Sequence, residues 1–145
     1  MSASTIHATA LLIGERALLI RGAARSGKSS LALALIRQAQ QDPSTFVRLI
    51  ADDRVYIDRL PDALAARAPA HLSGMIEERG KGILNLPYES CGVITAVLDL
   101  QEDASGLEAR VEIEGMKLPR FFHTPRAPFK LENALEIMEK AHIYG

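Results

Sequence analysis

The sequence predicts an α/β fold: one domain with a central mixed β-sheet and flanking helices. Two apolar, strand-like runs come first, at 7–13 and 17–22, joined by a short turn that contains glycine. A glycine-rich loop and a largely apolar helical segment follow. The run 46–53 is then apolar until its last two residues, which are aspartates, as when a buried strand delivers carboxylates to its end. Together these features form a strand-loop-helix-strand unit.

The other elements are expected from the residue pattern in chain order. From Ser26 the residues favour a helix that ends between Gln40 and Asp42, because Pro43 cannot continue it. Further strands are expected at 54–60, 93–100 and 107–115, a closing helix at 131–145, a surface excursion without a regular element at 61–74, a charged loop at 75–90 and a basic loop at 117–130.

Composition and charge narrow the classes of protein to which the chain can belong. Its 145 residues, 48% apolar and 24% charged, suit one globular domain, 1–145. The 17 basic and 18 acidic residues leave no positive excess, which disfavours nucleic acid and a membrane surface as partners. The single cysteine, Cys91, excludes an internal disulfide framework and suits a reducing cytoplasm. No apolar run approaches the roughly 18 residues of a membrane span, and no signal peptide is recognisable, so we expect a cytoplasmic protein.

The loop before the first helix carries the most specific motif in the chain. Residues 22–29 fill the pattern G-x-x-x-x-G-K-[ST], between an apolar strand and a helix. In this motif backbone N–H groups surround phosphate oxygens, the lysine reaches the β- and γ-phosphates, and the hydroxyl binds Mg²⁺. We therefore expect ATP and Mg²⁺ as ligands, with nucleotide-binding residues Gly22, Ala23, Ala24, Arg25, Ser26, Gly27, Lys28, Ser29 and Ser30. The chain lacks the string [NT]-K-x-D, so nothing supports specificity for guanine.

The paired aspartates Asp52 and Asp53 are the second candidate element of a site. A carboxylate at the end of the strand that follows a phosphate loop and helix is positioned to hold Mg²⁺ or its water. Since there are two, one can serve the metal while the other accepts a proton from an incoming hydroxyl.

Four separated motifs resemble the catalytic domain of HPr kinase/phosphorylase, the enzyme that phosphorylates a serine of the phosphocarrier protein HPr. They are "IHATALLI", "GAARSGKSSLAL", "LIADD" and "IEERGKGIL", in family order from residue 6 to residue 84. The last is similar to the family signature E-x-R-G-x-G-[IV] and is the most specific. The resemblance implies a P-loop architecture like that of phosphoenolpyruvate carboxykinase.

The resemblance also implies a role for each matching residue. Lys28 and Ser29 would hold the nucleotide phosphates and Mg²⁺, Asp52 would deprotonate the attacking serine, and Asp53 would be its partner at the metal. Glu77 matches an additional Mg²⁺-site carboxylate, Arg79 would lie near the transferred phosphate, and His7 matches an active-site histidine near the phosphates.

The implied function is an ATP-dependent serine kinase that acts on HPr in regulation by the phosphotransferase system, in a homo-oligomer that is commonly a hexamer. The chain begins almost at the histidine strand, so we expect a catalytic domain without the family's N-terminal domain. The later family loop reads P-V-R-P-G-R-N, whereas residues 125–131 lack its glycine, which makes kinase activity a safer expectation than phosphorolysis of phosphorylated HPr. Two alternatives stay open: a P-loop ATPase or small-molecule kinase, and an ATP-dependent switch that transfers no phosphoryl group to protein.

Overall fold

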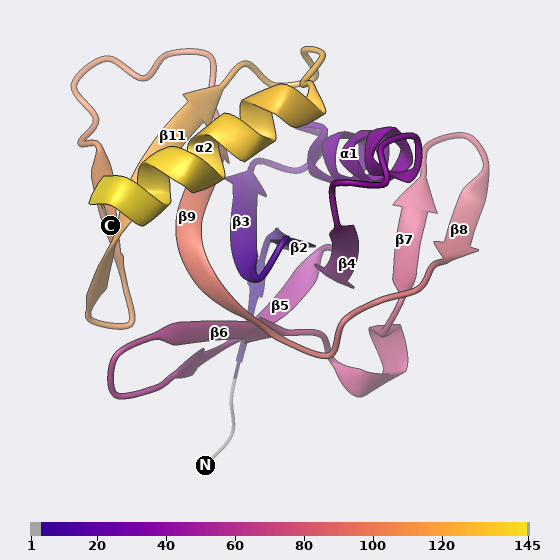
Figure 1. Cartoon of the computed structure of the whole chain (residues 1–145), viewed down its shortest axis with the longest axis horizontal. Coiled ribbons are helices and arrows are strands. Elements are labelled where there is room, and N and C mark those ends of the chain that lie inside the picture. Colours follow the sequence, from indigo (N-terminus) through magenta and orange to yellow (C-terminus); the bar gives the residue numbers. More distant parts are fainter. Residues whose placement is uncertain (1–3, 145) are drawn as a thin grey trace.

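A computed structural model describes residues 4–144, which form a mixed α/β fold (Figure 1). The strands are β1 Thr5–His7, β2 Thr9–Ile13, β3 Arg16–Gly22, β4 Val47–Ala51, β5 Arg54–Arg59, β6 Leu64–Arg67, β7 Met75–Glu78, β8 Gly82–Asn85, β9 Gly92–Leu100, β10 Arg110–Ile113 and β11 Met116–His123. The helices are α1 Lys28–Gln40, α2 Leu131–Tyr144 and a short 3-10 turn, η1, at Ala70–Leu72. The predicted α/β class and mixed sheet are confirmed.

Nine of the described strands belong to one sheet, which β9 holds together. Along its main path the order is β1-β5-β6-β9-β3-β2-β4, and β11 also pairs with β9 and carries β10 at its other edge. The β3-β9 and β9-β11 pairs are parallel, and the other pairs in the sheet are antiparallel. Strand β9 can serve three neighbours because its first residues pair with β6 and its last with β11.

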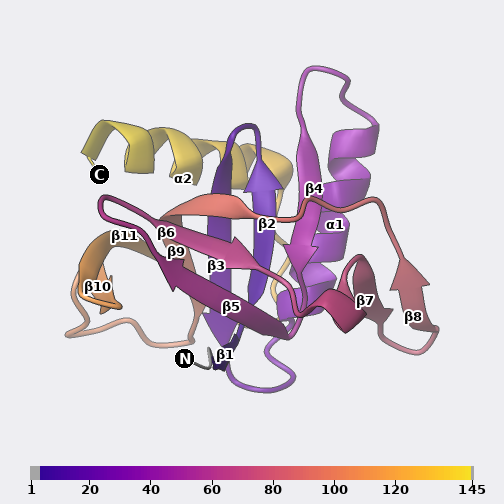
Figure 2. The same cartoon turned by 90° about the horizontal axis from the view of Figure 1, so that it is seen from below.

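Both faces of the central strands bury apolar side chains. Leu18 and Ile20 of β3 are fully buried in a cluster with Leu35 of α1, whereas Leu19 points to the opposite face and packs in a cluster with Val55 of β5. Helix α2 lies over β9 and β11 (Figure 1), and β5 and β6 run across β2 and β3 on the other side (Figure 2). The continuous apolar run of β3 thus reflects burial on both faces.

The strand order brings the phosphate loop and the aspartates to one edge. Strands β3 and β4 are each antiparallel to β2, which lies between them, so their carboxyl ends point the same way. The loop at 22–29 follows β3, and Asp52 and Asp53 follow β4. The predicted strand-loop-helix-strand unit is confirmed, with the helix beginning at Lys28.

The predicted basic loop at 117–130 is wrong over its first part, because Met116–His123 is strand β11. Its positive charges and Pro119 give this strand the composition of a solvated loop. Arg120 donates to the carboxylate of Asp99 (Nε to Oδ2, 2.7 Å), so its charge is compensated within the fold. Pairing with β9 begins only at Arg120, and therefore Pro119 removes no hydrogen bond from that pair.

Three other expectations need correction. The charged loop at 75–90 contains the hairpin β7-β8, in which Gly80 and Gly82 adopt φ values of 81° and 95°. The excursion at 61–74 contains β6 and η1. The strand expected at 7–13 is divided: β1 pairs with β5, whereas β2 pairs with β3 and β4.

The described part of the chain contains no helix that is long and apolar enough to cross a bilayer.

Candidate active site

The loop between β3 and α1 presents backbone N–H groups that could bind an anion. Arg25 and Gly27 take left-handed conformations, with φ of 65° and 98°, and α1 begins directly after Gly27. No side chain caps this helix, and its first turn has no acidic residue. The first N–H groups of a helix lack intrahelical acceptors and carry the positive end of the helix dipole. The geometry is that of a phosphate-binding helix terminus.

Gly22 is required by close approach, and Gly27 by its backbone conformation. A Cβ atom at Gly22 would lie 2.5 Å from Ser26 Oγ and 3.1 Å from Leu100 Cβ. A Cβ atom at Gly27 would lie 3.4 Å from the backbone of Arg126, on a residue whose φ already excludes most side chains. The loop therefore packs against residues that are distant in the sequence.

Lys28 lies across the loop. Its Nζ donates to the carbonyl oxygens of Gly22 (2.9 Å) and Ala23 (3.0 Å). Burial lowers the pKa of Lys28 below its ordinary value, and the negative charges of Asp53 and Asp52 oppose that effect. The Lys28 ammonium group thus lies over the phosphate loop, where it can contact phosphate groups bound there.

Asp52 is the centre of a hydrogen-bond cluster. It accepts from Ser29 Oγ (2.7 Å to Oδ1, 2.9 Å to Oδ2), from Thr9 Oγ1 (2.8 Å) and from the backbone N–H of Glu77 (3.4 Å). Ser29, the motif hydroxyl, is therefore in direct contact with the strand-end carboxylate, as in other phosphate-loop proteins. Sequence analysis missed Thr9, since no local pattern marks a buried threonine on β2 as the partner of Asp52.

Asp53 faces the other way and pairs with His7. Its Oδ1 lies 2.8 Å from His7 Nε2, and about half of each side chain is exposed. Asp53 has a φ of 70°, which turns its side chain away from that of Asp52, and its carbonyl accepts from the N–H of Ala8. The two adjacent aspartates thus have separate surroundings.

The β7-β8 hairpin brings Glu77 and Arg79 to the same pocket. Helix α1 anchors the hairpin, because Arg37 donates to both carboxylate oxygens of Glu78 (2.7 and 3.1 Å). This hydrogen bonding lowers the pKa of Glu78 and raises that of Arg37. Within residues 4–144 the Arg79 guanidinium has no ion-pair partner, so its charge is available to an anion.

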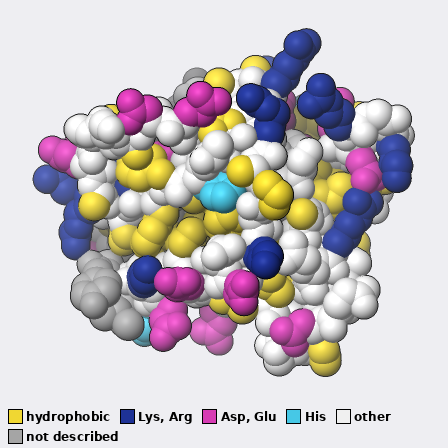
Figure 3. Space-filling model, turned by 90° about the horizontal axis from the view of Figure 1, so that it is seen from above, with side chains coloured by type: hydrophobic (Ala, Val, Ile, Leu, Met, Phe, Trp, Pro, Cys, Tyr) yellow, Lys and Arg dark blue, Asp and Glu magenta, His cyan; other side chains and the backbone are white. Residues whose placement is uncertain are grey.

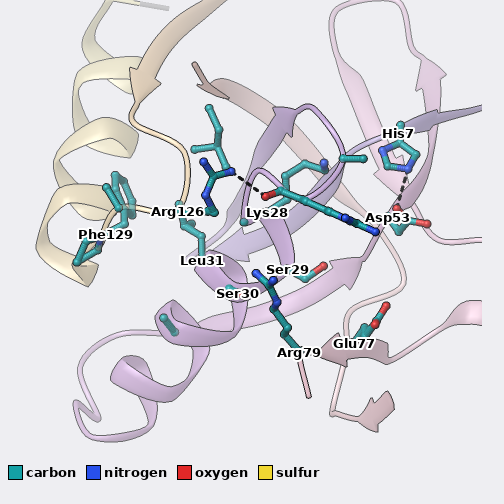
Figure 4. Close-up of a pocket in the computed structure, with 17 residues that line it drawn as sticks. His7, Lys28, Ser29, Ser30, Leu31, Asp53, Glu77, Arg79, Arg126 and Phe129 are labelled. Carbon is teal, nitrogen blue, oxygen red and sulfur yellow. Dashed lines mark hydrogen bonds and ion pairs between the residues drawn. The ribbon is translucent and has the colours of Figure 1, made fainter. Parts of the chain in front are cut away.

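Most of the predicted residues surround one open pocket of 870 Å³ (Figure 4). Those that line it are His7, Ala24, Arg25, Gly27, Lys28, Ser29, Ser30, Asp53, Glu77 and Arg79. Four do not line it: Gly22, Ala23, Ser26 and Asp52. Of the two aspartates, Asp53 thus faces the cavity directly, and Asp52 reaches it through Ser29.

The segment 124–130 forms a further wall that sequence analysis did not assign to the site. Arg126 is tied to the phosphate loop: its backbone N–H donates to Ser26 O (2.9 Å) and its Nη1 to Arg25 O (3.1 Å). Phe129 lines the same wall from beneath α2. The sequence signals were the basic, proline-containing composition of this stretch and its partial likeness to the later loop of the family.

The face at the carboxyl ends of β3 and β9 carries charges of both signs. Figure 3 shows basic and acidic side chains on it, with hydrophobic side chains between them. This mixture differs from the basic surface typical of nucleic-acid binding.

Comparison with known proteins identifies the family. The profile of the family described as HPr Serine kinase C-terminal domain matches residues 1–97, which include the phosphate loop, both aspartates and the β7-β8 hairpin. The chain belongs to this family. The predicted resemblance is thereby confirmed, and the wall at 124–130 lies beyond the matched residues.

Relatives and a solved structure agree with this assignment. HPr kinase/phosphorylase of Clostridium acetobutylicum is 38% identical over 82 residues, 57% of this chain and 25% of the relative. The Xylella fastidiosa protein of the same name is 37% identical over 86 residues, 59% of this chain and 25% of the relative. The matched part thus spans a quarter of these relatives. The HPr(Ser) kinase/phosphatase of Coxiella burnetii has the same fold, with a TM-score of 0.75, 23% identity, and coverage of 96% of this chain and 90% of that chain.

The residues of the site fit a magnesium-bound nucleotide. The described residues contain no cluster of three or more His, Cys, Asp or Glu side chains that would hold a metal alone. Mg²⁺ at nucleotide sites is usually bound through one or two carboxylates together with phosphate oxygens and water. Ser29, Asp53 and Glu77 beside the uncapped helix supply that donor set.

Proposed function

We propose that this chain is the catalytic domain of an ATP-dependent serine kinase that phosphorylates HPr. The observation that carries the proposal is the pocket in which the phosphate loop, the strand-end aspartates and the Glu77–Arg79 hairpin meet, in a member of the HPr serine kinase family. The active protein is a homo-oligomer, for which we propose the hexamer, and it works in the cytoplasm in regulation by the phosphotransferase system.

The phosphate loop positions the ATP. Backbone N–H groups of residues 24–30 hold the phosphate oxygens, and the Lys28 ammonium compensates the charge that develops on the γ-phosphoryl group. Magnesium, when bound, neutralises phosphate charge, and Ser29, Asp53 and Glu77 would hold it. Because such transfer requires little covalent chemistry from the protein, this positioning provides most of the catalysis.

Asp52 acts as the base. The serine oxygen of HPr forms a bond to the γ-phosphorus as the bond from that phosphorus to the ADP oxygen breaks, and the hydroxyl proton passes to Asp52. For this role the Ser29 hydroxyl must turn from Asp52 to the metal, so that the carboxylate can accept from the serine of HPr while the hydrogen bond from Thr9 holds it in place. Acting in reverse on phosphoserine with inorganic phosphate, the same carboxylate would serve phosphorolysis.

His7 and Arg79 both assist from the wall of the pocket. His7 orients Asp53 through their 2.8 Å contact. The uncompensated guanidinium of Arg79 faces the pocket near Ser29 and Ser30 (Figure 4). There it can bind the phosphoryl group during its transfer. The HPr serine approaches over the β7-β8 hairpin.

A transfer assay tests the proposal. The chain is incubated with γ-labelled ATP, Mg²⁺ and purified HPr, and the labelled residue is mapped by mass spectrometry. We expect label on one serine of HPr, and none with Lys28→Ala or Asp52→Asn. The matched variant Asp53→Asn should retain slow transfer that rises with Mg²⁺ concentration. If Asp53→Asn abolishes transfer at every Mg²⁺ concentration while Asp52→Asn retains it, the two carboxylate roles are the reverse of those proposed.

A further inference from the structure

Thr9 is a fully buried polar residue at the start of β2, opposite Ile20 near the end of β3. A hydroxyl in such a place destabilises the fold unless it has a hydrogen-bond partner. The partner is Asp52, whose Oδ1 accepts from Thr9 Oγ1 at 2.8 Å. A buried side chain of β2 is thereby joined to the proposed catalytic base.

A β-bulge in β4 turns Asp52 toward Thr9. Strand β4 pairs with β2 in one register up to Leu49 and in a register shifted by one residue at Ala51, so Ile50 is an extra residue. Ile50 and Ala51 consequently both pack on the β5 side of the sheet, whereas Leu49 packs on the α1 side. Regular alternation from Leu49 would direct Asp52 to the β5 side. The bulge directs it to the α1 side instead.

Thr9 points to the same side of the sheet. Ala8 and Ala10 pack on the β5 side, so the residue between them faces α1. Helix α1 lies beside β4 (Figure 2), and its second residue, Ser29, donates to both oxygens of Asp52 (2.7 and 2.9 Å). The carboxylate is thus held between a hydroxyl from α1 and a hydroxyl from β2.

These two hydroxyl groups differ in what they can do during the reaction. Ser29 is the motif hydroxyl that would turn to the metal, and it then gives up its hydrogen bonds to Asp52. Thr9 is buried and does not line the pocket, so it keeps its bond to Oδ1. Among the described donors, Oδ2 is left with the backbone N–H of Glu77, at 3.4 Å. Oδ2 is therefore the oxygen that is free to accept a proton.

We propose that Thr9 is a positioning residue for the reaction: its hydroxyl fixes Oδ1 of Asp52, and Oδ2 is thereby presented to the acceptor serine. The serine proton passes to Oδ2 as the serine oxygen bonds to the γ-phosphorus and the bond from that phosphorus to the ADP oxygen breaks. Thr9 itself contacts neither ATP nor HPr. This inference rests on the proposed kinase function, in which Asp52 is the base.

Steady-state kinetics of transfer from ATP to HPr test the role of the hydroxyl. Thr9→Val removes the hydroxyl and keeps the shape of the side chain. We expect kcat to fall by at least about tenfold, because a hydrogen bond to a charged group is lost. The KM values for ATP and HPr should not change, since Thr9 contacts neither substrate. Thr9→Ser should restore most of kcat, because it returns the hydroxyl.

Thr95→Val is the matched control, because it removes another buried hydroxyl from the same sheet. Within residues 4–144 Thr95 Oγ1 has no hydrogen-bond partner. Thr95 lies toward the beginning of β9, beside the first residues of β3 and away from the phosphate loop. Its replacement by valine should therefore leave kcat unchanged.

The carboxyl ¹³C resonance of Asp52 provides a readout that needs no transfer. It is assigned by its loss from Asp52→Asn, and it should shift in Thr9→Val, remain close to its original position in Thr9→Ser and stay unmoved in Thr95→Val. An unmoved resonance in Thr9→Val, a kcat that this variant retains, or a loss that Thr9→Ser fails to restore would each overturn the proposal. A chain that transfers nothing to HPr would refute the proposed kinase function, and the resonance alone would then decide whether Thr9 orients Asp52.

Discussion

Asp99 is the charged group whose removal should cost the fold most. Its side chain is 6% exposed and accepts three hydrogen bonds: from Arg21 Nε and Nη2, each at 2.8 Å, and from Arg120 Nε at 2.7 Å. Asp99→Ala would leave two guanidinium groups without their partner, one of them only 15% exposed. Breaking a buried pair in this way costs about 3–5 kcal/mol.

Urea and thermal unfolding measure this cost. For a chain of this size 1 kcal/mol corresponds to about 2–4 °C, so we expect the Tm to fall by roughly 6–20 °C. The matched control is Asp58→Ala, which removes an Arg67 pair of similar geometry (Nε to Oδ2, 2.7 Å) that is 42% and 36% exposed. An exposed pair contributes about 0–1 kcal/mol, so the control should change the Tm little.

A loss from Asp99→Ala no larger than that from Asp58→Ala would refute the reasoning. A second variant separates charge from volume: Asp99→Leu combined with Arg21→Met and Arg120→Met leaves no buried charge unpaired, and should recover most of the lost free energy of unfolding. Since Arg21 immediately precedes Gly22, the single variant should also weaken phosphate binding.

Three further predictions concern the pocket and its supports. Gly22→Ala should reduce the affinity for ATP by at least about tenfold, because the new Cβ atom would meet Ser26 Oγ. Adding Ser26→Gly should restore part of that affinity, as titration with ATP would show. An unchanged affinity in Gly22→Ala would contradict the close approach of Gly22 to Ser26. Burial lowers the pKa of Lys28, so its ammonium group loses its proton at a lower pH than an ordinary lysine does. The affinity for tripolyphosphate should therefore fall as the pH rises through that pKa. An affinity that stays constant up to pH 10.5 would be inconsistent with a buried Lys28. Arg37→Ala should release the β7-β8 hairpin from α1. Amide hydrogen exchange at residues 75–85 should then be faster, while the amides of α1 stay protected. Equal exchange at 75–85 in the variant and the unmodified chain would show that the Arg37–Glu78 pair does not anchor the hairpin.

Local patterns made the centre of the site predictable from sequence. The spacing of Gly22, Gly27 and Lys28 is a property of one continuous loop, and the apolar run ending in Asp52 and Asp53 required only recognition of a buried strand. Contacts that depend on strand order were not predictable in this way. The bond from Thr9 to Asp52 exists because β2 lies between β3 and β4, and no local signal encodes that order.

Charge compensation explains the largest error in the sequence-based fold. Strand β11 contains lysine and arginine and a proline, the composition of a solvated loop, yet Arg120 lies against the buried carboxylate of Asp99. Asp99 itself reads as an ordinary polar residue near the end of an apolar strand. Only the parallel pairing of β9 and β11 brings the two together, and the same pairing makes the 124–130 segment a wall of the pocket.

A single-turnover reaction of the unmodified chain with γ-labelled ATP, Mg²⁺ and HPr tests the central claim most directly, because the fate of the label distinguishes a protein kinase from an ATPase. We predict that the label appears on a serine of HPr at the rate at which ATP is consumed. Release of the label as inorganic phosphate at the same rate with and without HPr would contradict the proposed kinase function.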